Sequence, residues 1–298
     1  MITLMSVNAL DLYRETGPEQ QQRYAGLAEL VTRYQPDIVA IQEIITAGDT
    51  RADKAPGAEA GLRRWAEAVG MNYDAAGEPL LAVGGVWHHL GITYRDTCRR
   101  NPGTLIRPQP GTVRRLEREG AGMWHGAVAA IFDIGGHRMR IGTTHLGPFD
   151  QLWNQQNALQ LLREYHRDQT PGLLGGDMNC TAADPDYDPD PYDGYPWHPD
   201  HVHQLDEYGH VDRQASIRLE RIGRMKDCAR LAGAPYTTTG HHPNDNHPPR
   251  RIDRWHTTHN FPTAAVTGFR VVPVADIGLL SDHRPVLVDI DETLLPVG

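Results

Sequence analysis

The segment SDHRPVLVDI, residues 281–290, decides how we interpret this chain, because a polar tripeptide stands directly before a strand-like apolar run. Neighbouring side chains within a strand point to opposite faces of the sheet. Asp282 and His283 can therefore face one site only if both lie in the turn that leads into the strand. Pro285 supports this placement, since proline is tolerated at a strand's first residue but not at its centre. An acid and a histidine in such a turn can join a metal ligand to a phosphate-binding or proton-transferring group, although a polar turn alone explains them equally well.

The length and charge of the chain limit its class. With 298 residues it can bury a sizeable core. Its 29 basic and 38 acidic residues give a net charge of -9. An open groove that binds nucleic acid without sequence preference normally carries a basic surface, so we do not expect one here. A bound metal can nevertheless supply positive charge locally.

The cysteines and the N-terminal residues bear on localisation. Cys98, Cys180 and Cys228 are too few and too scattered for a disulfide framework or a zinc site, and they fit a reducing compartment. The first residues, MITLMSVN, lack the basic region and long apolar run of a signal peptide. No segment is apolar for long enough to span a bilayer. We therefore expect a cytoplasmic protein without membrane association, and no protein partner is evident.

Strands and helices are expected to alternate along the chain, which predicts an α/β layered fold in a single domain over residues 1–298. The expected strands are 2–7, 37–41, 86–94, 124–134, 137–144, 172–174, 252–257, 265–272 and 286–290. The expected helices are 16–34, with Thr16 as cap and Pro18 in the first turn, 62–69, 152–165 and 216–231. Gly135 and Gly136 separate two alternating runs and predict a tight hairpin turn.

Five short motifs place polar residues directly after apolar strands. Strand ends in layered α/β folds gather at one rim, where ligands bind. The residues concerned are Asn8, Glu43, His145, Asp177, Asn179, Asp282 and His283. Their carboxylate and amide oxygens suit Mg²⁺, which binds one or two carboxylates and keeps several waters. The remaining members belong to types that hold a phosphate and activate water.

Each of these residues also has an ordinary structural explanation. Asn8 can cap a turn, Glu43 can be a solvated carboxylate, and His145 can be a half-buried histidine whose ring is satisfied. Asp177 and Asn179 are typical of a turn in which Asp and Asn bond nearby backbone. All of these explanations must hold together to dismiss the set, so we favour a common site.

Six ordered motifs resemble those of the endonuclease/exonuclease/phosphatase superfamily, which includes DNase I-like nucleases. They are Asn8, Gln42-Glu43, Thr144-His145-Leu146, Gly176-Asp177-Met178-Asn179, Arg251-Ile252-Asp253-Arg254-Trp255 and Ser281-Asp282-His283. The resemblance runs from Met1 to about Ile290. It implies a four-layer α/β sandwich, in which two mixed β-sheets pack face to face between helices. It also implies a metal-dependent phosphoric ester hydrolase; none of the motifs specifies the substrate.

The resemblance also implies roles for individual residues. Glu43 resembles the principal Mg²⁺ ligand, with Asn8 and Asp282 nearby as metal ligands, and Mn²⁺ is an alternative ion. Asp177 and Asn179 resemble the groups that orient the attacking water and contact the phosphate. His283 resembles the histidine at the scissile phosphate, with Asp253 orienting it. His145 resembles the second histidine, a candidate acid for the leaving oxygen.

Several readings of the activity follow. The leading one is a phosphodiesterase, most simply a nuclease acting on DNA or RNA. The alternative within the same chemistry is a phosphatase or phosphodiesterase acting on a small phosphorylated metabolite. A different class is a catalytically silent binding module, against which the intact polar set argues.

Four departures from the family pattern carry further expectations. Trp255 stands where an aromatic contact residue is common and is expected in the core instead. His88, His89 and Arg95 are candidates for substrate contact. A polar cluster could bind a second metal or form a polar loop: His241, His242, Asp245 and His247.

The fourth departure is an insertion at about residues 182–212, which is rich in Asp, Pro and Tyr. Its prolines exclude a regular helix, and a loop of this length inside a compact domain is usually functional or disordered. Its carboxylates would disfavour a long polyanion near the rim. Alternatively they would bind a divalent ion while Tyr192 or Trp197 stacks on a base.

Overall fold

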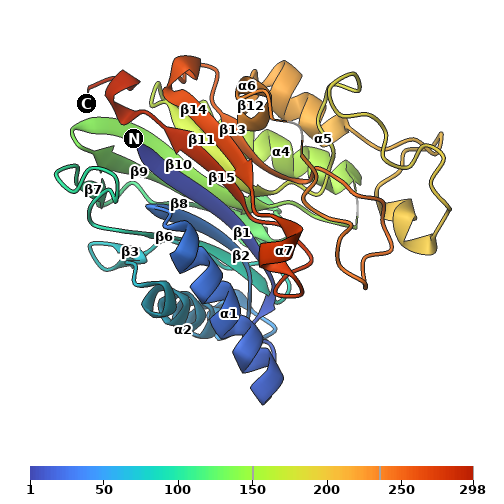
Figure 1. Ribbon diagram of the computed structural model, residues 1–298, viewed down its shortest axis with the longest axis horizontal. Coiled ribbons are helices and arrows are strands. Elements are labelled where there is room, and N and C mark those ends of the chain that lie inside the picture. Colours follow the sequence, from blue (N-terminus) through green and yellow to red (C-terminus); the bar gives the residue numbers. More distant parts are fainter. Residues whose placement is uncertain (150, 235, 298) are drawn as a thin grey trace.

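Two β-sheets lie face to face in the computed structural model, which describes residues 1–149, 151–234 and 236–297 (Figure 1). The first sheet has six strands in the order β14 (Val266–Val271), β15 (Val286–Ile290), β1 (Ile2–Leu12), β2 (Ile38–Ile45), β6 (His88–Tyr94) and β5 (Leu81–Ala82). β1 is parallel to β2 and antiparallel to β15, so this sheet is mixed. The C-terminal ends of β1 and β2 therefore meet at one edge.

The second sheet is also mixed. Its order is β12 (Lys226–Asp227), β13 (Asp253–Thr257), β11 (Gly172–Asp177), β10 (His137–His145), β9 (Gly126–Ile134) and β7 (Ile106–Pro108), and β8 (Arg114–Leu116) also pairs with β9. β10 and β11 are parallel, which brings His145 beside Asp177 in the register. A separate small sheet consists of β3 (Asp74–Ala75) and β4 (Glu78–Pro79).

Helices cover the outer faces of both sheets (Figure 1). On the first sheet they are α1 (Pro18–Tyr34), α2 (Arg51–Val69) and α7 (Val274–Ile277). On the second sheet they are α4 (Gln151–Tyr165) and α5 (Gln214–Ser216) with the π-helix Ile217–Ile222, whereas α6 (Cys228–Leu231) contacts β13 and β14 and packs on the cluster between the sheets. Short elements elsewhere are α3 (Arg118–Ala121) and the 3₁₀ turns Pro199–His203, Thr263–Ala265 and Glu292–Leu294. The expected four-layer α/β sandwich is confirmed.

The core is divided according to these layers. One apolar cluster lies between the sheets and contains Leu4, Phe132 and Trp255. A second joins the first sheet to α1 and α2, and a third joins the second sheet to α4 and α5. Leu4 and its neighbour Met5 belong to different clusters because adjacent side chains of a strand face opposite sides.

Several local expectations are confirmed. β15 has the expected bounds, and Asp282 and His283 lie in the bend before it. β9 and β10 form the predicted hairpin, with positive φ at Gly135 and Gly136 as a tight turn requires. Trp255 is fully buried, so it belongs to the core.

The ends of the first two strands were predicted too early. β1 continues past Asn8 to Leu12, and β2 continues past Glu43 to Ile45, so neither polar residue ends its strand. Both strands contain an irregularity at this point, because the register shifts between Asn8 and Leu12 and pairing resumes at Leu12 and Ile44. The polar residues interrupt the apolar pattern, but not the strands.

Three helix predictions also require correction. α1 has Gly17 at its N-cap without a side-chain cap bond, so Thr16 is not the cap. The segment 216–231 is not one helix, because Lys226 and Asp227 pair with β13 and separate the π-helix from α6. Arg224 adopts the left-handed conformation, with a φ of 52°, where the chain turns. Strand pairing here overrides a helical apolar pattern. The helix predicted at 62–69 is the last part of α2, which begins at Arg51.

The carboxylates of segment 182–212 mainly accept hydrogen bonds from the backbone. Asp188 accepts from the Ala182 N–H at 2.7 Å, and Asp190 accepts from the Val211 N–H at 2.9 Å. Asp184, Asp206 and Asp212 each accept from the N–H two residues later. These residues therefore shape turns, as Asp commonly does in loops.

Among the described residues, none of the helices is both long and apolar enough to cross a bilayer.

We predict that replacement of the buried Trp255 destabilises the protein far more than replacement of the exposed Trp197. Trp255 is fully buried between the sheets, whereas Trp197 is 69% exposed. Trp255→Ala should lower the free energy of unfolding by about 3–5 kcal/mol, and Trp197→Ala by less than about 0.5 kcal/mol. Urea denaturation measures both values, and equal losses in the two variants would contradict the assignment of the core.

Candidate functional site

The predicted residues meet at the rim where the two sheets come together. The amide nitrogen of Asn8, on β1, lies 3.0 Å from Glu43 Oε1 and 3.3 Å from Asp177 Oδ2. Asp177 ends β11 in the other sheet, so this amide joins the sheets. A second cross-sheet bond runs from Gln42 Nε2 to Thr143 Oγ1 at 2.8 Å. Polar bonds therefore hold the rim where the apolar core ends.

Glu43 is turned toward the rim by its backbone conformation. Its φ is 66°, which is uncommon for a residue other than glycine. Its Oε1 faces the Asn8 amide, while its Oε2 accepts a hydrogen bond from the Asp11 N–H at 2.9 Å. The Asn8 oxygen accepts from the Leu10 N–H at 3.2 Å. In this arrangement Asn8 acts as a donor between two carboxylates, and its predicted role as a metal ligand stays a prediction.

Asp177 stands between the two predicted histidines. Its Oδ2 lies 3.4 Å from His145 Nε2 and 3.8 Å from His283 Nε2. The other ring nitrogen of His283, Nδ1, lies 2.8 Å from Asp253 Oδ2. A carboxylate behind a histidine fixes the tautomer and the orientation of its ring. The Asp253–His283 pair therefore directs Nε2 toward Asp177.

Asn179 is close to the site but is engaged with backbone. Its N–H donates to Asp177 Oδ1 at 2.8 Å, and its side-chain nitrogen donates to the Leu146 carbonyl at 2.9 Å. Its φ of 45° continues the turn after β11. The turn explanation and the site explanation are thus compatible here, because the turn orients the Asp177 carboxylate.

The turn before β15 is tied to β1. Ser281 Oγ donates to the Asn8 carbonyl at 2.7 Å and accepts from the His283 N–H at 3.1 Å. Asp282 Oδ1 is buried and has no hydrogen-bond partner among the described residues. Such an orphaned oxygen is costly unless a ligand satisfies it. It fits the prediction that Asp282 coordinates a cation.

Two residues of the site have strongly shifted pKa values. Burial raises the pKa of Asp177 to about 7, and the nearby Asp253 and Glu43 add to the rise while His283 opposes it. Burial also disfavours the charged form of His283, but Asp253, Asp177 and Asp282 outweigh it and hold its pKa well above the ordinary value. The structure thus favours a cationic His283 among carboxylates.

His145 is in the opposite state. It is buried beside His125, whose ring stacks on it with centroids 4.1 Å apart. Burial, followed by the neighbouring imidazoles, holds the pKa of His145 well below the ordinary value. A neutral His145 can donate or accept one hydrogen bond through Nε2, but it is not a cation at neutral pH.

Sequence reasoning missed Asp11 as a site residue. Asp11, Glu43 and His88 each offer a ligand atom, and these atoms lie within 4.8 Å of one another. His88 Nε2 is 3.0 Å from Asp11 Oδ1. Asp11 could not be recognised because the irregularity in β1 turns it toward Glu43, and its φ of 53° has no signature in the sequence. His88 was foreseen only as a residue for substrate contact.

The other residues that were predicted to contact the substrate or a second metal are mostly engaged in contacts within the protein. His89 is fully buried and bonded to the Gly84 N–H, and burial lowers its pKa to about 4. Arg95 bonds the Pro36 carbonyl. The cluster of four residues at 241–247 does not form one of the candidate metal groups found among the described residues. In the insertion, Tyr192 is buried and bonds His247, whereas Trp197 is exposed.

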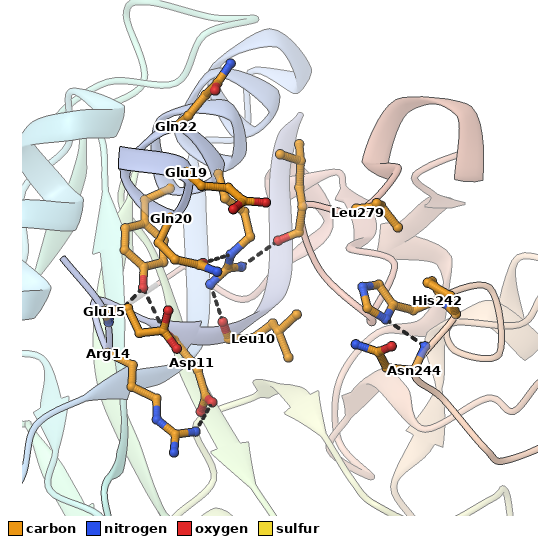
Figure 2. Close-up of a pocket in the computed structure, with 14 residues that line it drawn as sticks. Leu10, Asp11, Arg14, Glu15, Glu19, Gln20, Gln22, His242, Asn244 and Leu279 are labelled. Carbon is orange, nitrogen blue, oxygen red and sulfur yellow. Dashed lines mark hydrogen bonds and ion pairs between the residues drawn. The ribbon is translucent and has the colours of Figure 1, made fainter. Parts of the chain in front are cut away.

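A cavity of about 580 Å³ adjoins the Asp11 side of the rim (Figure 2). Asp11 and Arg14 stand at one end of the view, and His242 and Asn244 stand across the gap from Leu10. Asp177 and His283 do not line it. The cavity therefore adjoins Asp11 and not the Asp177–His283 pair.

The arrangement can act on an anionic ester. A cationic imidazole, an amide and several carboxylates surround one point, and two oxygen-rich groups are suited to a divalent ion. Such a set neutralises a phosphate and aligns water for attack.

Comparisons with known proteins show the family and the fold. The model of the endonuclease/exonuclease/phosphatase family matches residues 8–283. A mannosyl-6-phosphatase from Bacteroides thetaiotaomicron is 17% identical, with 98% of this chain and 100% of that chain covered and a TM-score of 0.63. The 3′ phosphatase NExo from Neisseria, bound to a product DNA hairpin, is 18% identical, with 98% and 100% covered and a TM-score of 0.61.

A third solved structure has the same fold. A humanized TDP2 of D. rerio is 15% identical, with 97% of this chain and 98% of that chain covered and a TM-score of 0.59. At these identities the likeness concerns the fold. No curated protein matches the chain.

We predict that Asp253→Asn lowers the pKa of His283. The substitution removes the largest interaction that favours the charged ring, and one pKa unit corresponds to about 1.4 kcal/mol. Titration of the imidazole nitrogens by NMR in metal-free protein should show a decrease of at least about one unit. Asp212→Asn, which alters a loop carboxylate, should leave His283 unchanged; an unchanged His283 in Asp253→Asn would refute the coupling.

Proposed function

Because the chain belongs to the endonuclease/exonuclease/phosphatase family, we propose that it is a metal-dependent hydrolase that cleaves phosphodiester bonds, with DNA or RNA as candidate substrates. The family assignment supports hydrolysis of phosphoric esters. The observation that carries the proposal further is the continuous polar path Glu43–Asn8–Asp177–His283–Asp253. This path links Glu43, the metal ligand that we propose, to an oriented histidine.

The metal requirement follows from the charge of the reactants. A phosphodiester is anionic, so it needs charge neutralisation and an aligned nucleophile. Glu43 and Asp282 would hold the ion, with Asn8 beside them, and the orphaned Asp282 oxygen fits this assignment. Oxygen ligands favour Mg²⁺, with Mn²⁺ as the alternative. When bound, the ion supplies Lewis acidity and orientation.

The chain's own residues would contact the phosphate, orient the water and assist the leaving oxygen. Cationic His283, supported by Asp253, would contact a phosphate oxygen. Asp177, whose pKa is raised to about 7, can accept or release a proton near neutral pH and would orient the water with Asn179. His145 is neutral, so it would donate a hydrogen bond to the leaving oxygen and would not act as a preformed cationic acid.

We predict that Glu43→Ala, Asp177→Ala and His283→Ala each abolish hydrolysis while the fold is retained. Loss of one group that stabilises the transition state commonly costs a factor of about 10²–10³, and loss of the metal ligand should cost more. Steady-state kinetics measure the losses, and circular dichroism checks the fold. His210→Ala, an exposed histidine in the insertion, is the control. Near-normal turnover in any of the three variants would exclude its assigned role.

A comparison of simple esters separates the proposed activities. We expect bis-p-nitrophenyl phosphate to be cleaved with Mg²⁺ and not with EDTA, and p-nitrophenyl phosphate to be cleaved poorly. Preference for the monoester would instead favour a phosphatase of small metabolites. No turnover of either ester, nor of plasmid DNA or RNA, would point to a binding module.

A further inference from the structure

A continuous series of rings leads outward from the predicted site. His145 Nε2 lies 3.4 Å from Asp177, and the His125 ring stacks on His145 at 4.1 Å with an angle of 23°. The Trp124 ring follows at 6.3 Å from His125, nearly perpendicular to it. The path from the reactive carboxylate to Trp124 is therefore built from rings in contact.

Beyond Trp124 the rings reach the surface. Its centroid lies 4.7 Å from that of Trp153 and 6.2 Å from that of Phe149, and Phe149 lies 5.5 Å from His203. We call these four residues the aromatic wall. Phe149 is 59% exposed, and His203 is also exposed. The wall is thus half-buried at its Trp124 end and open to solvent at its Phe149 end.

The inner part of the wall is firmly held. The backbone N–H of Trp124 donates to Asn157 Oδ1 at 3.2 Å, and the Trp153 indole donates to the Gly122 carbonyl. The Arg118 guanidinium lies 5.7 Å from the Trp124 ring and 5.8 Å from the Trp153 ring. A cation beside aromatic faces favours an anionic ligand with a planar group.

We propose that the aromatic wall stacks a planar aromatic group of the substrate on the His145 side of the scissile phosphate. This inference rests on the proposed function, because it assigns a specificity site to the same reaction. Scattered exposed apolar residues need no explanation. The wall differs because it is contiguous and continues directly into the predicted reactive residues.

The chemistry of the wall also limits the size of the ligand. Grooves that follow a long single strand combine several stacking rings with a series of cations. Of the described residues, Arg118 alone places a guanidinium over these rings. The net charge of -9 agrees with this shortage of cations. The substrate class that fits is therefore a short phosphodiester with a nucleobase or another aryl group.

Paired substrates of equal charge test the wall. The wild-type protein should cleave a thymidine dinucleotide with a kcat/KM at least about tenfold higher than that of the same compound lacking the base on the leaving side. Phe149→Ala should remove most of that preference and leave cleavage of the abasic compound within about twofold, and Phe149→Trp should restore the preference. A comparison of kcat/KM for a p-nitrophenyl ester and its methyl analogue shows whether a simple aryl group can replace the base.

Two exposed aromatic residues outside the wall serve as controls. Trp197 and Tyr208 are 69% and 78% exposed, so Trp197→Ala and Tyr208→Ala should keep the wild-type preference. If Phe149→Ala behaves like these controls, or if the wild type cleaves both dinucleotide compounds equally, the inference is wrong while the hydrolase proposal stands.

Calorimetry in EDTA tests stacking independently of catalysis. Thymidine monophosphate should bind the wild type more tightly than deoxyribose phosphate, and Phe149→Ala should lose the difference. If no ester is cleaved but this difference is found, the proposed function fails and the aromatic wall is retained. If the wild type binds both compounds equally, stacking on the wall is refuted.

Discussion

The site depends on one amide, that of Asn8, which is placed between carboxylates from two different sheets. Its bond to Glu43 lies within the first sheet, whereas its bond to Asp177 is possible only because β1 and β11 face each other across the core. The apolar cluster between the sheets therefore sets the distance over which the polar groups meet. A shift of one sheet against the other would separate the Glu43 side of the site from the His283 side.

The carboxylates of both sheets meet at the rim, and they determine its electrostatics. Asp177, Asp253 and Glu43 repel one another, and burial weakens the screening by water. The protein accommodates the charges by raising the pKa of Asp177 and by holding His283 as a cation. The raised pKa of Asp177 costs stability above the ordinary pKa of a carboxyl group, whereas the raised pKa of His283 reflects favourable pairing with the carboxylates. The two shifts therefore act on stability in opposite directions.

Local patterns in the sequence predicted the structure correctly where local chemistry determines it. Pro285 and the run after it fixed the turn and β15, and the glycine pair fixed the hairpin. Prediction failed where tertiary contacts decide. The irregularity that turns Asp11 and Glu43 toward His88 requires positive φ at residues other than glycine, which no pattern reveals. In the same way, the pairing of Lys226 with β13 broke a segment that looked helical.

The sequence suggests that the acidic residues of segment 182–212 repel a polyanion or bind an ion, and the structure adds a local role for two of them. In segment 182–212 the carboxylates of Asp188 and Asp190 accept hydrogen bonds from backbone N–H groups and so shape turns. The repulsion that an incoming phosphate meets arises instead from the site's own carboxylates. His283 supplies one positive charge against several negative ones. A bound cation would offset this repulsion, which is the physical reason for the metal that we propose.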